Sequence, residues 1–195
     1  FLKKNGAGLL LCLAISIPAW FLGKSFPVIG GPVFAILIGM VLTLILKEKE
    51  RTTIQDLQTQ EKSCVEKYEK YANQARDPEL KSLFQTLQKE EQKHYDSLGQ
   101  VLAGTVPECN CNDSAGRDYK PKATYNDMTN PEDKQNDAFL ATDCIGTEKL
   151  VSGEYNTDVF VFGESGVRKL LADIQIEEQN HAEMLYKYKT ANGMA

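Results

Sequence analysis

The chain has 195 residues, of which 42% are hydrophobic and 25% charged, and its formal net charge is −5 at pH 7. This composition excludes a wholly disordered chain and a small disulfide-stapled domain. The charge is unevenly distributed, because residues 1–50 carry a net +3 and residues 51–195 a net −8. Phosphate recognition needs a basic surface, so the acidic part is not expected to bind nucleic acid. We therefore expect two different modules, 1–50 and 51–195.

Two apolar runs without charges fill the first module, at residues 6–23 and 25–46. A helix needs about 20 apolar residues to cross the bilayer core, which suits the second run and is marginal for the first. Turn-forming Gly23-Lys24-Ser25 separates the runs, and lysines flank both ends. Because cytoplasmic loops are rich in Lys and Arg, we expect a transmembrane hairpin in contact with lipid over residues 6–46, with the following module in the cytoplasm. A signal peptide and a buried soluble hairpin are the alternatives.

The hairpin resembles the first two membrane helices of the bacterial sulfate exporter family, on the segment GLLLCLAISIPAWFLGKSFPVIGGPVFAILIGMVL within residues 5–46. Two helices cannot form the repeats from which transporters are built, so an exporter fragment is the weaker functional alternative. The charged stretch KEKERTTIQ that follows indicates a junction between unrelated modules. A natural gene fusion, an engineered fusion and an assembly artefact would each explain it. The first residue, Phe1, indicates a processed or partial sequence.

The second module contains an internal repeat with an offset of 87 positions. The segment QKEEQKHYDSL at 88–98 aligns with QIEEQNHAEML at 175–185. The same register, without a gap, pairs Glu61 with Glu148 and Tyr68 with Tyr155. Agreement of Glu, Tyr and apolar positions in one register predicts a duplicated helical hairpin.

Each half of the repeat is expected to form two helices. Asp77-Pro78 and Ser165 are typical helix starts, and Gly104, Gly163 and Gly193 are typical stops. Between the two hairpins lie residues 105–133, which are rich in Pro, Asn, Asp and Gly and have no hydrophobic period. Short turns within the hairpins and one long crossover between them predict an all-α, ferritin-like four-helix bundle. The expected helices run over about 53–76, 78–104, 134–162 and 165–190.

Acidic and histidine residues interrupt the apolar stripe of every helix at one level. On the second helix, the 3–4 spacing of Leu83 and Leu87 continues to Glu91 and His94 before it reaches Leu98. The fourth helix repeats this pattern, and a single Glu takes the equivalent place on the first and third helices. Four carboxylates and two imidazoles are thus expected to point into the core: Glu61, Glu91, His94, Glu148, Glu178 and His181.

Metal ions would explain this pattern, because burying uncompensated carboxylates costs several kcal/mol per ion. One Glu from each of two helices and Glu-x-x-His from the other two is the ligand set of ferritin-like di-iron and di-manganese proteins. Oxygen ligands with one imidazole per metal favour Fe, with Mn as the alternative. A chance Glu-x-x-His is the alternative reading, but both histidines of the chain fall in the repeated motif. Glu90 and Glu177 lie about 100° from the stripe and are expected to be solvated.

Tyr68 and Tyr155 lie two helical turns after the first Glu of each half, on the same face. They are either hydrogen-bond partners of a metal ligand or redox tyrosines. Alternatively, they are core tyrosines whose hydroxyls have found a partner.

Five cysteines complete the list of candidate residues. Cys12 lies in a membrane run, and Cys64 and Cys144 are expected to be small buried hydrophobic residues. Cys109 and Cys111 lie in the crossover, where they form a redox pair, an intermolecular link or an exposed pair without a role.

Residues 53–195 resemble the ferritin-like, CotF-type spore coat proteins of Firmicutes. The segments that carry the resemblance are EKYEKYANQARDPELKSLF, EEQKH, TEKLVSGEYNT, IQIEEQNHAEMLYKY and NGM. The resemblance implies a four-helix bundle in the spore coat, or in spore-associated iron handling. The wider ferritin-like superfamily implies Fe(II) oxidation, peroxide reduction or oxygenation. Two functions are thus expected as alternatives, a dimetal oxidoreductase that uses dioxygen or peroxide and a structural coat protein, either of which could form homo-oligomers.

Overall fold

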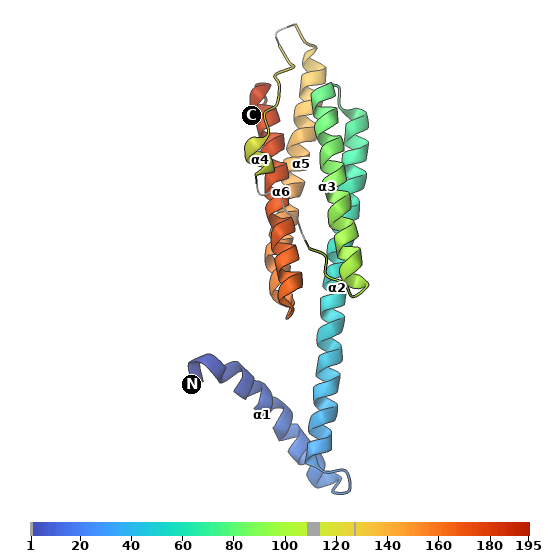
Figure 1. Ribbon diagram of the computed structural model, residues 1–195, viewed down its shortest axis with the longest axis vertical. Helices are drawn as coiled ribbons and strands as arrows, with labels where there is room; N and C mark the ends of the chain where they lie inside the picture. Colours follow the sequence, from blue (N-terminus) through green and yellow to red (C-terminus); the bar gives the residue numbers. More distant parts are fainter. Residues whose placement is uncertain (1, 109–113, 127) are drawn as a thin grey trace. The chain divides into compact units, whose positions relative to one another are not determined.

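The computed structural model of the protein describes residues 2–108, 114–126 and 128–195. Every regular element in these residues is a helix (Figure 1), which confirms the expected all-α class. The chain divides into two compact units, residues 1–50 and 51–195.

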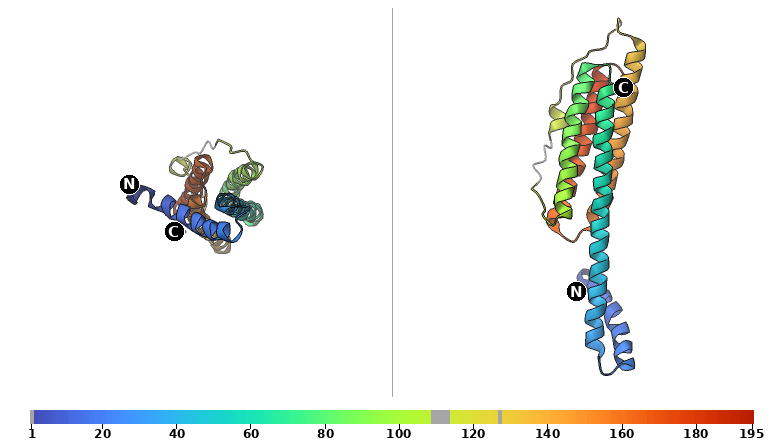
Figure 2. Two further views of the ribbon diagram at one scale, coloured as in Figure 1. Left: turned by 90° about the horizontal axis from the view of Figure 1, so that it is seen from below. Right: turned by 90° about the vertical axis from the view of Figure 1, so that its right-hand side faces the viewer.

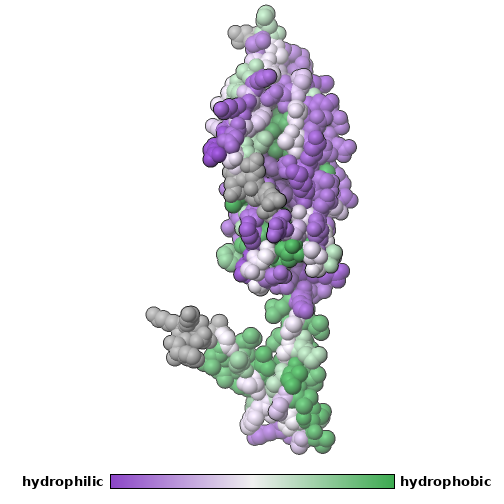
Figure 3. All heavy atoms as spheres, in the orientation of Figure 1, coloured by the Kyte–Doolittle hydropathy of each residue, from purple (hydrophilic) through white to green (hydrophobic). Residues whose placement is uncertain are grey.

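The first unit consists of α1 (Leu2–Ser25) and the first part of α2 (Gly31–Gln74). Both helices are long and apolar enough to cross a membrane. Apolar side chains form large patches on the face of this unit that Figure 3 shows. The turn between the helices lies at residues 26–30 and not at Gly23-Lys24-Ser25, because α1 continues through Ser25. Gly30, with a φ of +79°, supplies the left-handed conformation that reverses the chain.

The second unit contains four long helices: the later part of α2, α3 (Pro78–Leu102), α5 (Pro131–Asp158) and α6 (Ser165–Ala191). Side-chain contacts place α2 beside α3 and α5, and α6 lies beside the same two helices (Figure 2). Short connections make α2 and α3 antiparallel, and likewise α5 and α6. One long crossover, which includes the single-turn α4 (Ala115–Asp118), joins the two pairs. This arrangement agrees with the ferritin-like bundle expected from the sequence.

Two helix starts follow the same local rule. Asp77 and Asn130 each accept the backbone N–H two residues ahead, and each precedes a proline in the first turn. The Asn130 cap explains why α5 begins at Pro131 and not at 134. Ser165, expected as a cap, is instead the first residue of α6 and follows Glu164.

Helix ends also differ from expectation in two places. The predicted boundary at residue 53 is absent, because α2 runs unbroken from Gly31 to Gln74. No Gly or Pro occurs between residues 40 and 74, so nothing in the backbone stops the helix where the side chains change from apolar to charged. The third bundle helix ends at Asp158 and continues as a 3₁₀ turn, η1 (Val159–Val161).

The bundle core is apolar at both ends and polar between them. One buried cluster includes Leu80, Phe84 and Tyr188, and the other includes Ile54 and Leu98. The six predicted polar residues lie between these clusters on every helix. The two apolar clusters therefore hold the helices together on either side of the polar level.

Two buried aspartates tie one end of the bundle together. Asp137 accepts the backbone N–H groups of Arg76 and Asp77, at 3.0 Å and 2.8 Å, and the hydroxyl of Tyr125 at 2.8 Å. Asp77 accepts the hydroxyl of Tyr188 at 2.6 Å. These bonds fix the α2–α3 turn to α5, α6 and the crossover.

A fragment that begins at Thr52 is expected to be a soluble, helical domain. All of the buried clusters of the bundle lie within it, so it keeps its own core. Circular dichroism and a cooperative thermal transition would check this expectation. An insoluble or unfolded fragment would show that the apolar hairpin is needed for folding.

Candidate metal centre

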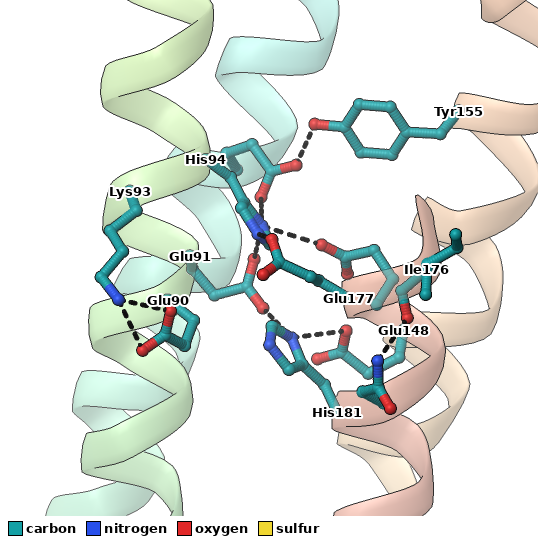
Figure 4. A network of polar contacts seen from close by, with 12 residues as sticks. Glu90, Glu91, Lys93, His94, Glu148, Tyr155, Ile176, Glu177 and His181 are labelled. Carbon is teal, nitrogen blue, oxygen red and sulfur yellow. Dashed lines mark hydrogen bonds and ion pairs between the residues drawn. The ribbon is translucent and has the colours of Figure 1, made fainter. Parts of the chain in front are cut away.

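Six polar side chains from four helices converge in the middle of the bundle (Figure 4). All six are at most 3% exposed. They form two overlapping groups of four, in each of which one ligand atom per residue lies within 4.8 Å of the others. The groups are Glu61, Glu91, His94 and Glu178, and Glu91, Glu148, Glu178 and His181.

The composition of the two groups follows the internal repeat. Glu91 and Glu178, which are equivalent positions of the repeat, belong to both groups. Each group adds one His and one Glu of its own. The structure thus brings together all six residues predicted from the sequence, and the offset of the repeat relates the members of one group to those of the other. Their role as metal ligands stays a prediction.

Both imidazoles present Nδ1 to the carboxylates. Nδ1 of His94 lies 3.1 Å from Glu178, 3.6 Å from Glu91 and 3.8 Å from Glu61. Nδ1 of His181 lies 2.8 Å from Glu91 and 3.6 Å from Glu148. The two rings are nearly parallel, with centroids 5.8 Å apart. Nδ1 of each ring therefore lies on the inner side of the cluster, and Nδ1 of His181 donates a hydrogen bond to Glu91.

The described part of the chain has seven buried side-chain N or O atoms without a hydrogen-bond partner, and six of them belong to this cluster. They are Oε2 of Glu61, Glu91 and Glu148, both carboxylate oxygens of Glu178, and Nδ1 of His94. Buried polar atoms in folded proteins are nearly always hydrogen-bonded, and exceptions call for an explanation such as an absent ion. The donor set fits two divalent cations, since four carboxylates balance their charge.

Burial and mutual repulsion perturb the ionisation of the cluster. Burial, followed by the charge of Glu91, raises the pKa of Glu178 well above its usual value, and burial raises that of Glu61 to about 8. Burial also acts to raise the pKa of Glu91, but the hydrogen bond with His181 and the nearby imidazole of His94 outweigh it and lower the pKa. Burial acts to lower the pKa of each imidazole, but the surrounding carboxylates raise it, for His181 to about 10. Without metal, the cluster thus retains protons at neutral pH.

The two tyrosines connect the halves of the repeat. The hydroxyl of Tyr68 on α2 donates to Glu148 on α5, and that of Tyr155 on α5 donates to Glu61 on α2. Both rings are buried in the core. Each tyrosine is thus both a core residue and a hydrogen-bond partner of a predicted ligand. The two expected roles are therefore compatible.

Glu177 was expected to be solvated, and this prediction is wrong. Its Oε2 accepts a hydrogen bond from Nε2 of His94 at 2.8 Å, and its side chain is only 15% exposed. The helical angle measured on α6 alone could not reveal this contact, because the partner lies on α3. Glu90, its equivalent in the repeat, pairs instead with Lys93 and is 34% exposed.

A cavity of about 280 Å³ adjoins the cluster between α3 and α6. Its lining includes Glu90, Lys93, Glu177 and His181, but not His94. Of the cysteines, Cys64 and Cys144 are buried free thiols, as expected. Cys109 and Cys111 lie outside the described residues.

The Coat F domain family model matches residues 136–195 of the chain. This segment covers most of α5 and all of α6, and it contains Glu148, Glu178 and His181. The match confirms the resemblance to spore coat proteins of this type over the second helical hairpin.

The N-terminal region is similar to UPF0324 membrane proteins. Identity is 71% over 42 residues with the protein of Streptococcus pneumoniae strain R6, and the match covers 22% of this chain and 12% of the relative. It is 58% over 45 residues with a protein of Streptococcus pyogenes serotype M6, and the match covers 23% of this chain and 13% of the relative. For a Fusobacterium nucleatum protein it is 50% over 44 residues, with the same coverage of 23% and 13%. The matches thus span about an eighth of the length of these relatives, and they confirm that the first unit resembles membrane proteins. No solved structure matches the chain.

Proposed function

We propose that the bundle binds two metal ions, iron in the first place and manganese as the alternative, and that it uses them to oxidise Fe(II) with dioxygen or peroxide. The observation that carries this proposal is the pair of overlapping four-residue groups, in which Glu91 and Glu178 serve both positions. The carboxylate oxygens of Glu91 and Glu178 that lack a hydrogen-bond partner also support the proposal.

Each metal position would have its own residues. Glu61 and His94 would hold one ion, Glu148 and His181 the other, and Glu91 and Glu178 both. When bound, a pair of ferrous ions supplies two electrons, which with two protons reduce hydrogen peroxide to two water molecules or dioxygen to hydrogen peroxide. The protein positions the carboxylates through Tyr68 and Tyr155 and surrounds the site with two apolar clusters.

The donor atoms favour iron or manganese over a thiolate-binding metal. Oxygen ligands with one imidazole per ion suit these harder cations. Cys64 lies one turn from Glu61, but burial and then the nearby carboxylates raise the pKa of its thiol. A thiol that stays protonated is a poor ligand.

For the location, we propose a membrane anchor formed by residues 6–46 with the bundle in the cytoplasm. Two apolar helices, the names of the N-terminal relatives and the flanking lysines support this proposal. The Coat F domain match supports a spore-coat setting.

A structural coat protein without catalysis is the second candidate, and the Coat F domain match favours it. In that case the metals would only neutralise the buried carboxylates and stabilise the fold. A fusion or fragment that carries part of an exporter is the third candidate. The N-terminal relatives support it as an origin of the first unit, but two helices cannot form the repeats that transport needs.

Replacing Glu178 by Ala is expected to abolish binding of at least one metal ion, because this carboxylate belongs to both four-residue groups. Metal content per chain, measured by elemental analysis after loading with Fe(II) under anaerobic conditions, checks the expectation. Glu183→Ala on the same helix is the matched control, since Glu183 is an exposed partner of Lys187. Two metals per chain with unchanged affinity in Glu178→Ala would show that the ligand assignment is wrong.

Metal affinity is expected to rise with pH between about 6 and 8, by about tenfold per unit for each proton displaced. The pKa of Glu61 is raised to about 8 and that of His181 to about 10, so both hold protons that a metal must displace. Calorimetric titrations in buffers of different ionisation enthalpy would measure the proton release. An affinity independent of pH would contradict the presence of retained protons.

Oxidation of Fe(II) distinguishes the catalytic candidate from the structural one. With Fe(II) bound, addition of dioxygen or peroxide is expected to oxidise two irons per chain faster than iron in buffer, and Glu178→Ala is expected to lose this acceleration. Stopped-flow absorbance of ferric iron is the measurement. A protein that binds two metals without accelerating their oxidation would favour the structural candidate.

A further inference from the structure

Around the six predicted ligands, the symmetry between the halves of the repeat is broken. Glu90 and Glu177 are equivalent positions, each directly before the bridging Glu of its helix. Lys93 and Asn180 are also equivalent, each directly before the His. The first pair is chemically identical, whereas the second pair replaces a cation by a neutral amide.

The two outer carboxylates also have different partners. Nζ of Lys93 lies 2.9 Å and 2.7 Å from the two carboxylate oxygens of Glu90, on the outer side of α3 (Figure 4). Asn180 cannot form such an ion pair. Its Oδ1 accepts the N–H of Gly116 at 3.0 Å, and its amide donates to the carbonyl of Ile176 at 3.1 Å.

The two histidines consequently have different surroundings. Nε2 of His94 donates to Glu177 at 2.8 Å. Within the described residues Glu90 makes no such contact with His181, because its carboxylate is paired with Lys93. His181 lines the cavity of about 280 Å³ between α3 and α6, and His94 does not.

We propose that the two metal positions differ in affinity. Glu177 is a positioning residue for His94, whereas Glu90 is paired with Lys93 and does not position His181 in the same way. This inference rests on the proposed function. A carboxylate on the outer N–H of a ligating imidazole fixes its orientation and tautomer and raises its basicity at the other nitrogen. The His94 position is then the tight one. The His181 position is the weaker one, and it is also the position whose imidazole lines the cavity.

Anaerobic titration of the full chain with Fe(II) in detergent tests the proposal, with equilibrium dialysis and metal analysis as the readout. The wild type is expected to bind two ions per chain with constants separated by about tenfold or more, the effect typical of losing an outer partner of a ligand. Glu177→Gln should weaken the tight constant by about tenfold and bring the two constants together. Lys93→Asn frees Glu90 to reach His181 and should strengthen the weak constant by a similar factor.

Lys169→Asn is the matched control. Lys169 is also an exposed lysine that pairs with an acid on its own helix, Asp173, and its loss should leave both constants unchanged. Lys93→Asn is expected to bind metal more tightly than the wild type. Misfolding would weaken binding, so it cannot produce this result.

The outcomes separate this inference from the proposed function. Two ions bound with equal constants in the wild type, or no gain in Lys93→Asn, would overturn the inequality and leave the dimetal centre intact. Failure to bind any metal would overturn both.

Discussion

The structure depends on how four carboxylates and two imidazoles are accommodated inside an apolar bundle. A buried ion is tolerated only when it is paired and hydrogen-bonded, and removing that compensation costs several kcal/mol. Among the described residues, six atoms of this cluster lack a hydrogen-bond partner. The apolar clusters at the two ends of the bundle hold the four helices together, although the buried polar atoms between them are incompletely hydrogen-bonded. The fold therefore holds four carboxylates close together at a level whose polar atoms are incompletely paired, and stability is supplied by other parts of the core.

The duplicated hairpins are joined by reciprocal contacts at this level. Tyr68 and Tyr155 each belong to one half and donate to a carboxylate of the other half. Each of the two four-residue groups likewise combines residues from both hairpins. Neither hairpin can therefore form the centre alone. Since the Coat F domain match covers only the second hairpin, a complete centre needs the first hairpin as well.

Sequence spacing predicted the clustering of the six residues because they replace apolar ones on a regular stripe. Glu91 and His94 follow from continuing the leucine spacing of α3, and the repeat then indicates their equivalents on α6. The spacing along one helix carries no information on contacts with another helix, so it could not indicate that Glu177 on α6 pairs with His94 on α3. The single-turn α4 was missed as well, since four residues are too few for a period. Its Gly116 is held by Asn180, a tertiary contact that no local pattern records.

The unbroken α2 explains how two chemically different units can be joined without a linker. Side chains of the first unit such as Leu10 and Leu44 are 68% and 66% exposed, and their transfer out of water is favourable by about 25 cal/mol per Å². An α-helix satisfies its backbone hydrogen bonds internally, so it can pass from lipid to water without leaving polar groups unpaired. Only the side chains must change, and they do so within the charged stretch that begins at Lys47. The junction between two modules of different composition therefore needs no turn, cap or loop.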